Sequence, residues 1–156
     1  MSYSTIIGLF HVAAYIRLSR EVGDKDVSDS VGNQRKLLLE YIRQKEDLKL
    51  YDIYIDDGYT GLNFNRPSFQ RMLTDIDAKK INCVIVKDLS RIGRDHIETS
   101  RFLERVFPEM GVRFISITDN IDSYQQAYDL ILPIKNLFNE QYARDISKKV
   151  YTAIDR

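Results

Sequence analysis

The sequence predicts an α/β fold in which helices cover a largely parallel sheet. Short apolar runs alternate along the chain with segments whose apolar residues recur at helical spacing, and this alternation is typical of parallel sheets with crossover helices. The run at 81–86 shows little polar alternation, as expected for a strand that is covered on both faces. The 156 residues, 44% of them hydrophobic and 29% charged, suffice for one domain with a real core.

The expected elements follow one another in order, each with its own local signal. Four apolar runs are the expected strands, at 10–16, 50–55, 81–86 and 112–118. Four segments are the expected helices, at 30–45, 67–79, 95–111 and 125–156, the last one after a short polar link at 119–123. The Ser-Asp-Ser segment 28–30 offers N-caps for the first helix, and Pro67 fits the first turn of the second. Gly111 ends the third helix, where Pro108 is expected to tighten or bend the last turn.

Composition and charge limit the class of protein. No basic segment precedes the first apolar residues, and no apolar run is long enough to span a bilayer, so we expect a cytoplasmic protein without a membrane partner. The single Cys83 lies in an apolar run and is expected to be a buried thiol. The net charge is zero, whereas proteins that grip DNA by themselves are usually basic. The chain is therefore either not a nucleic-acid protein or not the main DNA anchor of one.

Four arginines and one serine follow the expected strands. The first strand ends with Arg17 and Ser19, the Gly-rich loop after the second ends with Arg66, and the segment after the third contains Arg91 and Arg94. Functional residues of parallel sheets gather at the carboxyl ends of the strands. We therefore expect these five side chains to meet at one edge of the sheet.

This set of side chains fits a phosphodiester target. Arg17 and Ser19 share one strand face with Tyr15, and a hydroxyl beside a guanidinium can be an activated nucleophile that faces a phosphate. Guanidiniums also stabilise the charge that builds up during in-line displacement. Metal-assisted hydrolysis is disfavoured because His11 and His96 show no ligand spacing. The sequence has no Gly-x-Ser-x-Gly elbow, Walker loop or dinucleotide fingerprint, and we expect no metal and no cofactor.

Three motifs, in order along the chain, resemble those of one family. They are Tyr15-Ile-Arg17-Leu-Ser19, then Asp57-Gly-Tyr-Thr60-Gly61 with Arg66-Pro67, and finally Asp88-Leu-Ser90-Arg91-Ile-Gly-Arg94-Asp95. Gln34 in the first helix also matches. On these residues the chain resembles the catalytic domain of a serine recombinase, of the resolvase/invertase family. Segments 66–73 and 139–145 resemble the large serine recombinases, which are found as transposases and integrases of mobile elements.

The resemblance implies a resolvase-like three-layer fold with a long C-terminal helix, and DNA recombination that needs neither metal nor ATP. Ser19 would attack the phosphodiester, form a 5′-phosphoserine link and release a 3′-hydroxyl, before strand exchange and religation. The residues that would bind and activate the scissile phosphate are Arg17, Arg66, Arg91 and Arg94. The residues that would support the site are Tyr15, Gln34, Thr60, Ser90, Asp88 and Asp95.

The resemblance also implies partners and a division of the chain. Residues 1–122 would form the catalytic core, and residues 123–156 a helical region for oligomerisation that leads towards further DNA-binding domains. Homodimers would assemble into a homotetramer on double-stranded DNA at specific recombination sites. The residues expected to contact DNA are Arg17, Arg66, Lys87, Arg91, Arg94, Arg144 and Lys148. The apolar stripe expected at the oligomer interface is Leu137, Phe138, Tyr142, Ile146 and Val150.

One position departs from the family pattern. Ser90 stands directly before Arg91, where smaller resolvases commonly have an acid. Asp88 and Asp95 are candidates to replace that carboxylate. The spacing does not decide between them, and the general acid and general base stay unassigned.

Several of these residues also have a structural interpretation. Arg17, Arg91 and Arg94 can be salt-bridge partners of nearby aspartates, Arg66 can simply be exposed, and Tyr15 can be core packing with a hydrogen-bonded tip. Two other functions stay open. One is a DNA-binding or assembly module of the same fold that does not cut. The other is a flavodoxin-like regulatory domain, which predicts acidic or cofactor-binding residues where this sequence has arginines.

Overall fold

A five-stranded sheet forms the centre of the molecule in the computed structural model, which describes residues 9–18, 30–57, 66–93 and 95–124. The strands are β1 (Phe10–Leu18), β2 (Leu48–Asp57), β3 (Cys83–Val86), β4 (Arg113–Ser116) and β5 (Ile121–Asp122). Their order is β2-β1-β3-β4-β5, with every pair parallel except β4 and β5. The predicted α/β fold with a largely parallel sheet is confirmed. The expected helix at 125–156 lies outside the described residues.

The short edge strand β5 is the element that the sequence prediction missed. Asn120 adopts a left-handed conformation with φ 57°, and its N–H donates to the carbonyl of Ile117 at 3.1 Å. The chain reverses there, so that Ile121 and Asp122 pair antiparallel with β4. The expected polar link at 119–123 is therefore wrong in this part. A strand of two residues is too short to produce the alternation that identifies strands in a sequence.

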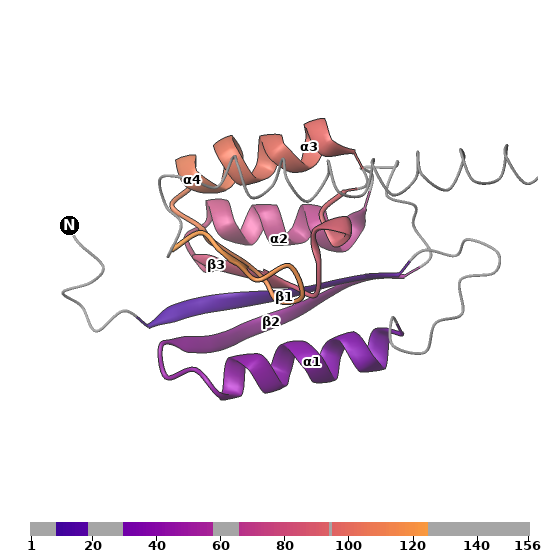
Figure 1. The fold of residues 1–156 in the computed structure, drawn as a ribbon. Coiled ribbons are helices and arrows are strands. Elements are labelled where there is room, and N and C mark those ends of the chain that lie inside the picture. The colour runs from indigo at the N-terminus through magenta and orange to yellow at the C-terminus, as the bar shows by residue number, and fades with distance from the viewer. Residues whose placement is uncertain (1–8, 19–29, 58–65, 94, 125–156) are drawn as a thin grey trace, which may run out of the picture.

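Helices lie on both faces of the sheet (Figure 1). They are α1 (Val31–Arg43), α2 (Pro67–Asp77), α3 (His96–Arg101) and α4 (Phe107–Glu109), with a π-helical turn, η4 (Phe102–Val106), between the last two. Figure 1 shows α1 alone on one face and the other helices on the opposite face. The Ser30 hydroxyl accepts a hydrogen bond from Asn33 N at 3.1 Å and caps α1, as predicted from the sequence.

The π turn is the local response of the third expected helix to Pro108. The N–H of Phe107 donates to Phe102 O, five residues back, so the turn is widened instead of tightened. Proline has no N–H to donate, and its ring crowds the carbonyl four residues before it. The widened turn keeps Phe102 and Phe107 buried on the same side of the helix. Pro108 was expected to tighten or bend the last turn of this helix, but the structure has a widened turn just before it.

Alternation along β1 divides the core into two layers. Ala13 and Tyr15 belong to the cluster packed with α2, η4 and α4, whereas Val12, Ala14 and Ile16 belong to the cluster packed with α1. The larger cluster contains a row of neighbouring aromatic rings, which are Tyr15, Phe69, Phe102, Phe107 and Phe114. Tyr15, near the end of β1, therefore faces the core layer that contains α2.

A partly buried arginine, Arg113, closes the opposite end of the sheet. The Arg113 guanidinium lies 4.8 Å from the centre of the Phe10 ring and 4.9 Å from that of Tyr124. It donates to both carboxylate oxygens of Asp122, at 3.0 and 2.7 Å, and to Asp47 at 2.9 Å. These contacts join β1, β4 and β5 where β4 begins.

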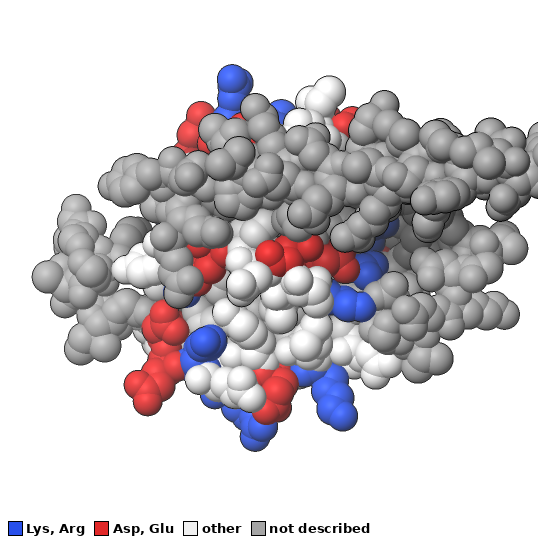
Figure 2. Space-filling model, in the orientation of Figure 1, with Lys and Arg blue, Asp and Glu red and all other residues white. Residues whose placement is uncertain are grey.

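Charges of both signs lie on the face shown in Figure 2, where acidic and basic side chains of the described residues are intermingled. This distribution agrees with the zero net charge of the chain. Among the described residues, no helix combines the length and the apolar character that crossing a membrane requires.

Candidate active site

Three arginines meet at the carboxyl ends of the parallel strands. Arg17 belongs to β1, Arg66 immediately precedes α2, and Arg91 lies in a 3₁₀ turn, η3 (Leu89–Arg91), that follows β3. Their relative exposures are 2%, 0% and 7%, so all three guanidiniums lie inside the protein and not on its surface. A buried cation requires compensation by hydrogen bonds or opposite charges, and the surrounding groups show how each one is held.

Arg17 and Arg91 bind each other's main chain. Arg17 Nε donates to Arg91 O at 3.3 Å, and Arg91 Nη1 donates to Arg17 O at 2.9 Å. Arg17 Nη2 also donates to Ser90 O. From the other face of the sheet, Gln34 Nε2 donates to the same Arg17 carbonyl at 3.3 Å. Main-chain carbonyls of β1 and η3 thus hold both guanidiniums at the carboxyl end of β1.

Arg66 is part of the interior of the site. Nη1 donates to Arg91 O at 2.9 Å and to the Tyr15 hydroxyl at 3.2 Å, and Nη2 donates to Ile92 O at 2.7 Å. The guanidinium also lies 4.4 Å from the centre of the Phe69 ring, a favourable cation–π position. The alternative that Arg66 is simply exposed is therefore wrong.

The Tyr15 hydroxyl connects Arg66 to an acid. It donates to Asp56 Oδ2 at 2.9 Å while it accepts from Arg66. Burial raises the pKa of Tyr15 above its ordinary value, Arg66 opposes this effect, and Asp56 adds to it. The hydroxyl therefore keeps its proton and stays a donor. The interpretation of Tyr15 as core packing with a hydrogen-bonded tip is confirmed.

Asp56 is a site residue that the sequence analysis missed. Its carboxylate is buried and accepts from Ser68 N at 3.0 Å and from Phe69 N at 3.0 Å, besides Tyr15. It thereby caps the N-terminus of α2 from the end of β2, because Arg66 at the N-cap position supplies no capping side chain. Its position in the strand could have indicated this role, because side chains alternate along β2 and Asp56 lies on the same side as the buried Tyr54.

The η3 turn carries Ser90 and Arg91, and Asp88 is its N-cap. Asp88 Oδ1 accepts from Ser90 N at 3.0 Å and from the Ser90 hydroxyl, and Asp88 Oδ2 lies 3.3 Å from Arg91 Nη2. Arg91 therefore has an aspartate partner, as its structural interpretation proposed. Ser90 is exposed. Asp95 is exposed as well, and it caps α3 by accepting from Ile97 N at 2.9 Å.

Two further residues that the sequence analysis missed hold the start of this turn and the segment just after it. Asp119 Oδ2 accepts from Leu89 N at 2.8 Å, and the Thr99 hydroxyl donates to Gly93 O at 3.1 Å. Asp119 could have been predicted from the sequence, because it comes shortly after the strand β4. Thr99 lies on the buried side of α3, and nothing in the sequence pattern indicates its role. Lys87, expected to contact DNA, directly follows β3, and its carbonyl accepts from Thr118 N at 2.9 Å.

Other predicted residues lie outside the described part of the chain. They are Ser19, Thr60, Arg94, Arg144, Lys148, Leu137, Phe138, Tyr142, Ile146 and Val150. The structure therefore brings together Tyr15, Arg17, Arg66 and Arg91, with Gln34 and Asp88 in contact with them.

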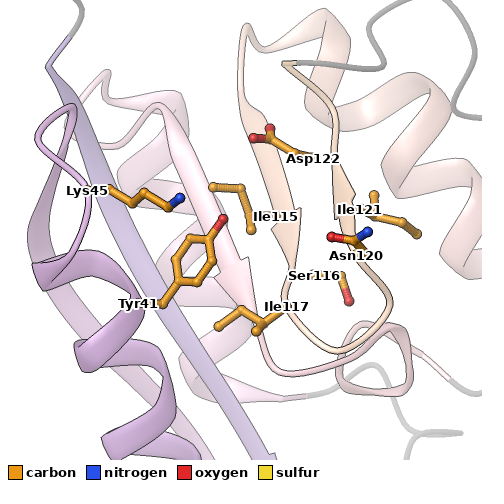
Figure 3. A pocket seen from close by; sticks show the side chains of 8 residues that line it. All are labelled: Tyr41, Lys45, Ile115, Ser116, Ile117, Asn120, Ile121 and Asp122. Atoms are coloured by element: carbon orange, nitrogen blue, oxygen red, sulfur yellow. The ribbon is translucent and has the colours of Figure 1, made fainter.

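A pocket of about 310 Å³ lies elsewhere, between α1 and the β4–β5 hairpin. Figure 3 shows Tyr41 of α1, and Lys45 just after that helix, across from Ile117, Asn120 and Asp122. The pocket is on the α1 face of the sheet, and none of the three clustered arginines lines it. We therefore take the arginine cluster, and not this pocket, as the candidate active site.

The fold and the cluster define an α/β domain with buried arginines at its strand ends. Residues 12–156 match the family model described as Resolvase, N terminal domain. The chain therefore belongs to the resolvase family. Comparison with curated protein sequences gives no match.

Solved structures support this assignment. The chain is similar to the N-terminal catalytic domain of TP901-1 integrase, with 29% identity and a TM-score of 0.69 over 87% of this chain and 98% of that one. A resolvase family site-specific recombinase from Streptococcus pneumoniae has 22% identity and a TM-score of 0.64, over 94% and 97%. The C-terminal catalytic domain of ISC1926 TnpA, an IS607-like serine recombinase, has 19% identity and a TM-score of 0.56, over 94% and 99%. The last two structures show the fold alone. The family match and the similarity to the integrase domain confirm the predicted membership of the serine recombinase family.

Proposed function

We propose that this chain is the catalytic domain of a site-specific DNA recombinase of the large serine type, with Ser19 as its nucleophile. The observation that carries the proposal is the cluster of Arg17, Arg66 and Arg91 at the strand ends. Arg17 stands two positions before Ser19 in the sequence. Membership of the resolvase family and similarity to an integrase catalytic domain support it. The reaction class is transfer of a DNA phosphoryl group to a serine and back to a DNA hydroxyl.

The proposed cleavage is an exchange of one ester for another. Ser19 Oγ attacks the phosphorus, a bond from Oγ to phosphorus forms, and the bond from phosphorus to the 3′ oxygen breaks. The Oγ proton goes to a general base, and the departing 3′ oxygen takes a proton and becomes a hydroxyl. Religation is the reverse step with a 3′-hydroxyl of another strand as the nucleophile. Because the ester energy is kept in the phosphoserine bond, the cycle needs no ATP.

The arginines supply the electrostatic part of this chemistry. Guanidiniums stay charged at any working pH and can bind two phosphate oxygens at once. Arg17 and Arg91, with Arg94, would face the scissile phosphate, while Asp88 offsets part of the charge of Arg91. A rigid set of donors stabilises developing charge without reorganising during the reaction. Ser90 cannot act as the carboxylate of smaller resolvases, and the general acid and base remain unassigned.

Assembly and DNA contact extend the proposal beyond the described residues. Residues 1–122 would be the catalytic core, and the helical region 123–156 would join homodimers into a tetramer through its apolar stripe. Lys87, directly after β3, and Arg144 and Lys148 of that region would contact the DNA backbone. The intermingled charges of Figure 2 and the zero net charge agree with a domain that is not the main DNA anchor.

The test is a search for a covalent protein–DNA adduct. The intact protein is incubated, in EDTA, with DNA that carries the ends of the element encoding it, and the products are resolved on a denaturing gel. We expect an adduct at the 5′ end of the break that Ser19→Ala abolishes, while the matched change Ser100→Ala on α3 leaves it intact. Adduct in Ser19→Ala, or none in the wild type despite specific DNA binding, would refute the proposal.

The exposed Ser90 favours a second candidate, a DNA-binding module of this fold that does not cut. In that case the wild type would bind and assemble without an adduct. Ser90→Asp would then be the first change to examine, because it restores an acid directly before Arg91.

A further inference from the structure

The pocket between α1 and the β4–β5 hairpin is a second polar site, away from the arginine cluster. Its volume of about 310 Å³ is at the lower end of the range of small-molecule sites. We propose that it binds a small carboxylate with an apolar body, and that the bound molecule steadies the turn that carries Arg91. None of the three clustered arginines lines the pocket, so this inference does not depend on the recombination reaction.

Two donors on the α1 side are available to a ligand. The Lys45 ammonium lies 5.2 Å from the centre of the Tyr41 ring, and it has no carboxylate partner among the described residues. The Tyr41 hydroxyl has no hydrogen-bond partner in the described part of the chain. Burial raises the pKa of Tyr41, and Asp122 adds to this effect, so the hydroxyl keeps its proton and can donate. Figure 3 shows both side chains reaching from the α1 side towards the hairpin.

A third donor faces them from the hairpin. Asn120 lines the pocket, and its side-chain amide has no hydrogen-bond partner among the residues that the structure describes. Its backbone is left-handed, with φ 57°, and its N–H donates to Ile117 O at 3.1 Å. The tight turn therefore fixes the point from which this side chain projects. One cation and two neutral donors around a cavity are suited to the two oxygens of a carboxylate.

The acid on the pocket lining is already paired. Arg113 donates to both carboxylate oxygens of Asp122, at 3.0 and 2.7 Å, and Tyr124 N donates to Oδ1 at 3.0 Å. The positive charge of Arg113 offsets that of Asp122 at close range. Of the two charged residues on the lining, Asp122 is thus neutralised by its neighbour and Lys45 is not. The remaining charge favours an anion in the pocket.

The rest of the lining calls for an apolar group beside that anion. Ile115, Ile117 and Ile121 line the pocket, and Ile115 and Ile121 are otherwise almost completely buried. A carboxylate alone would leave these side chains in contact with water, whereas a purely apolar molecule would cover Lys45 without pairing it. A molecule that carries both parts satisfies the whole lining.

The hairpin turn also holds the segment that leads into η3. Asp119 Oδ2 accepts from Leu89 N at 2.8 Å. The N–H and the hydroxyl of Thr118 both donate to Lys87 O, at 2.9 Å each. Asn120 directly follows Asp119, so a ligand that is held by Asn120 restrains the acceptor of the Leu89 amide. Occupation of the pocket is thereby passed to the first residue of the turn that carries Arg91.

Isoleucine methyl NMR of the intact protein measures binding, with hexanoate as the probe. We expect hexanoate to shift the methyl signals of Ile115, Ile117 and Ile121 and to leave that of Ile76 unchanged, because Ile76 lies on α2, across the sheet from α1. Acetate lacks the apolar body and hexanol lacks the charge, so each should bind at least about tenfold more weakly. Equal binding of hexanol and hexanoate, or no shift at the three pocket isoleucines, would overturn the proposal.

Substitutions of exposed residues test the site without disturbing the core. Lys45→Met keeps an unbranched side chain and removes the charge, so it should weaken hexanoate binding about tenfold. Lys49→Met is the matched control, because Lys49 is exposed and does not line the pocket, and it should leave the affinity unchanged. Asn120→Gly removes the amide from a turn that glycine readily adopts, and a smaller loss is expected. Equal affinity of the wild type and Lys45→Met would refute the assignment of the anion to Lys45.

Hydrogen exchange tests the connection to the turn. Saturating hexanoate should slow exchange of the Leu89 amide in the wild type and in Lys49→Met. At the same concentration it should have little effect in Lys45→Met. Unchanged exchange in a wild type that binds hexanoate would overturn the steadying of the turn. Neither readout involves DNA cleavage, so these results stand apart from the test of the proposed function.

Discussion

Removal of the buried Arg66 guanidinium is the sharpest test of how the site is held together. Among the described residues, Arg66→Ala deletes three hydrogen bonds, to Arg91 O, Ile92 O and the Tyr15 hydroxyl, at 2.9, 2.7 and 3.2 Å. At about 1.5 kcal/mol for each bond to a charged donor, the loss is about 4.5 kcal/mol. Release of the desolvation cost of the cation and entry of water reduce this to about 3 kcal/mol.

Urea unfolding measures this loss, and Arg71→Ala is the matched control. Arg71 lies on α2, also over a tyrosine ring, but its ion pair with Asp52 is exposed, with side-chain exposures of 50% and 48%. Surface ion pairs contribute about 0–1 kcal/mol, so we expect a free energy of unfolding within about 1 kcal/mol of the wild type for Arg71→Ala. Arg66→Lys keeps the charge without the planar fork and should fall between the two. A loss for Arg66→Ala no larger than that for Arg71→Ala would refute the reasoning.

Three further predictions concern the buried thiol, two buried tyrosines and the ion pair of Arg113. Burial raises the pKa of the Cys83 thiol, so this single cysteine should resist thiol reagents in the folded protein and react on unfolding; prompt labelling of the native state would contradict this. Burial also raises the pKa values of Tyr15 and Tyr54, so the folded state holds these protons more tightly. The free energy of unfolding should therefore be fully present below about pH 10 and decline above it, and a rise there would contradict the assignment. Arg113→Ala leaves the Asp122 carboxylate without its bidentate partner and should cost about 2–3 kcal/mol in urea unfolding, whereas an unchanged midpoint would show that the pair is dispensable.

The fold could be predicted from apolar periodicity and from residues at element ends, because both are visible in short stretches of the sequence. The apolar run that ends at Ile16 and the Pro67 start of α2 need no distant residue to be recognised, and both elements form as expected. β5 and the π turn before Pro108 depend on pairing and on helix strain, which leave no repeating pattern in the sequence.

The candidate site likewise contains residues that local sequence predicts and residues whose roles depend on distant partners. Arg17, Arg66 and Arg91 could be placed at one sheet edge because each lies at the end of a parallel strand or in the segment that follows one. The burial of Arg66 and the roles of Asp56 and Thr99 could not be predicted, because each depends on partners far away in the sequence. Asp56 accepts from residues 12 and 13 positions later, and from Tyr15, 41 positions earlier. A single sequence shows which residues can make such bonds, but it does not show which ones do.

The central claim is that Ser19 carries the DNA during strand exchange, and the attached residue can be identified directly. The trapped adduct is digested with protease and nuclease, and mass spectrometry locates the residual nucleotide. The account predicts a 5′-nucleotide phosphate esterified to Ser19 and a free 3′-hydroxyl on the other end of the break. A nucleotide on any other residue, or a link to the 3′ end, would contradict it.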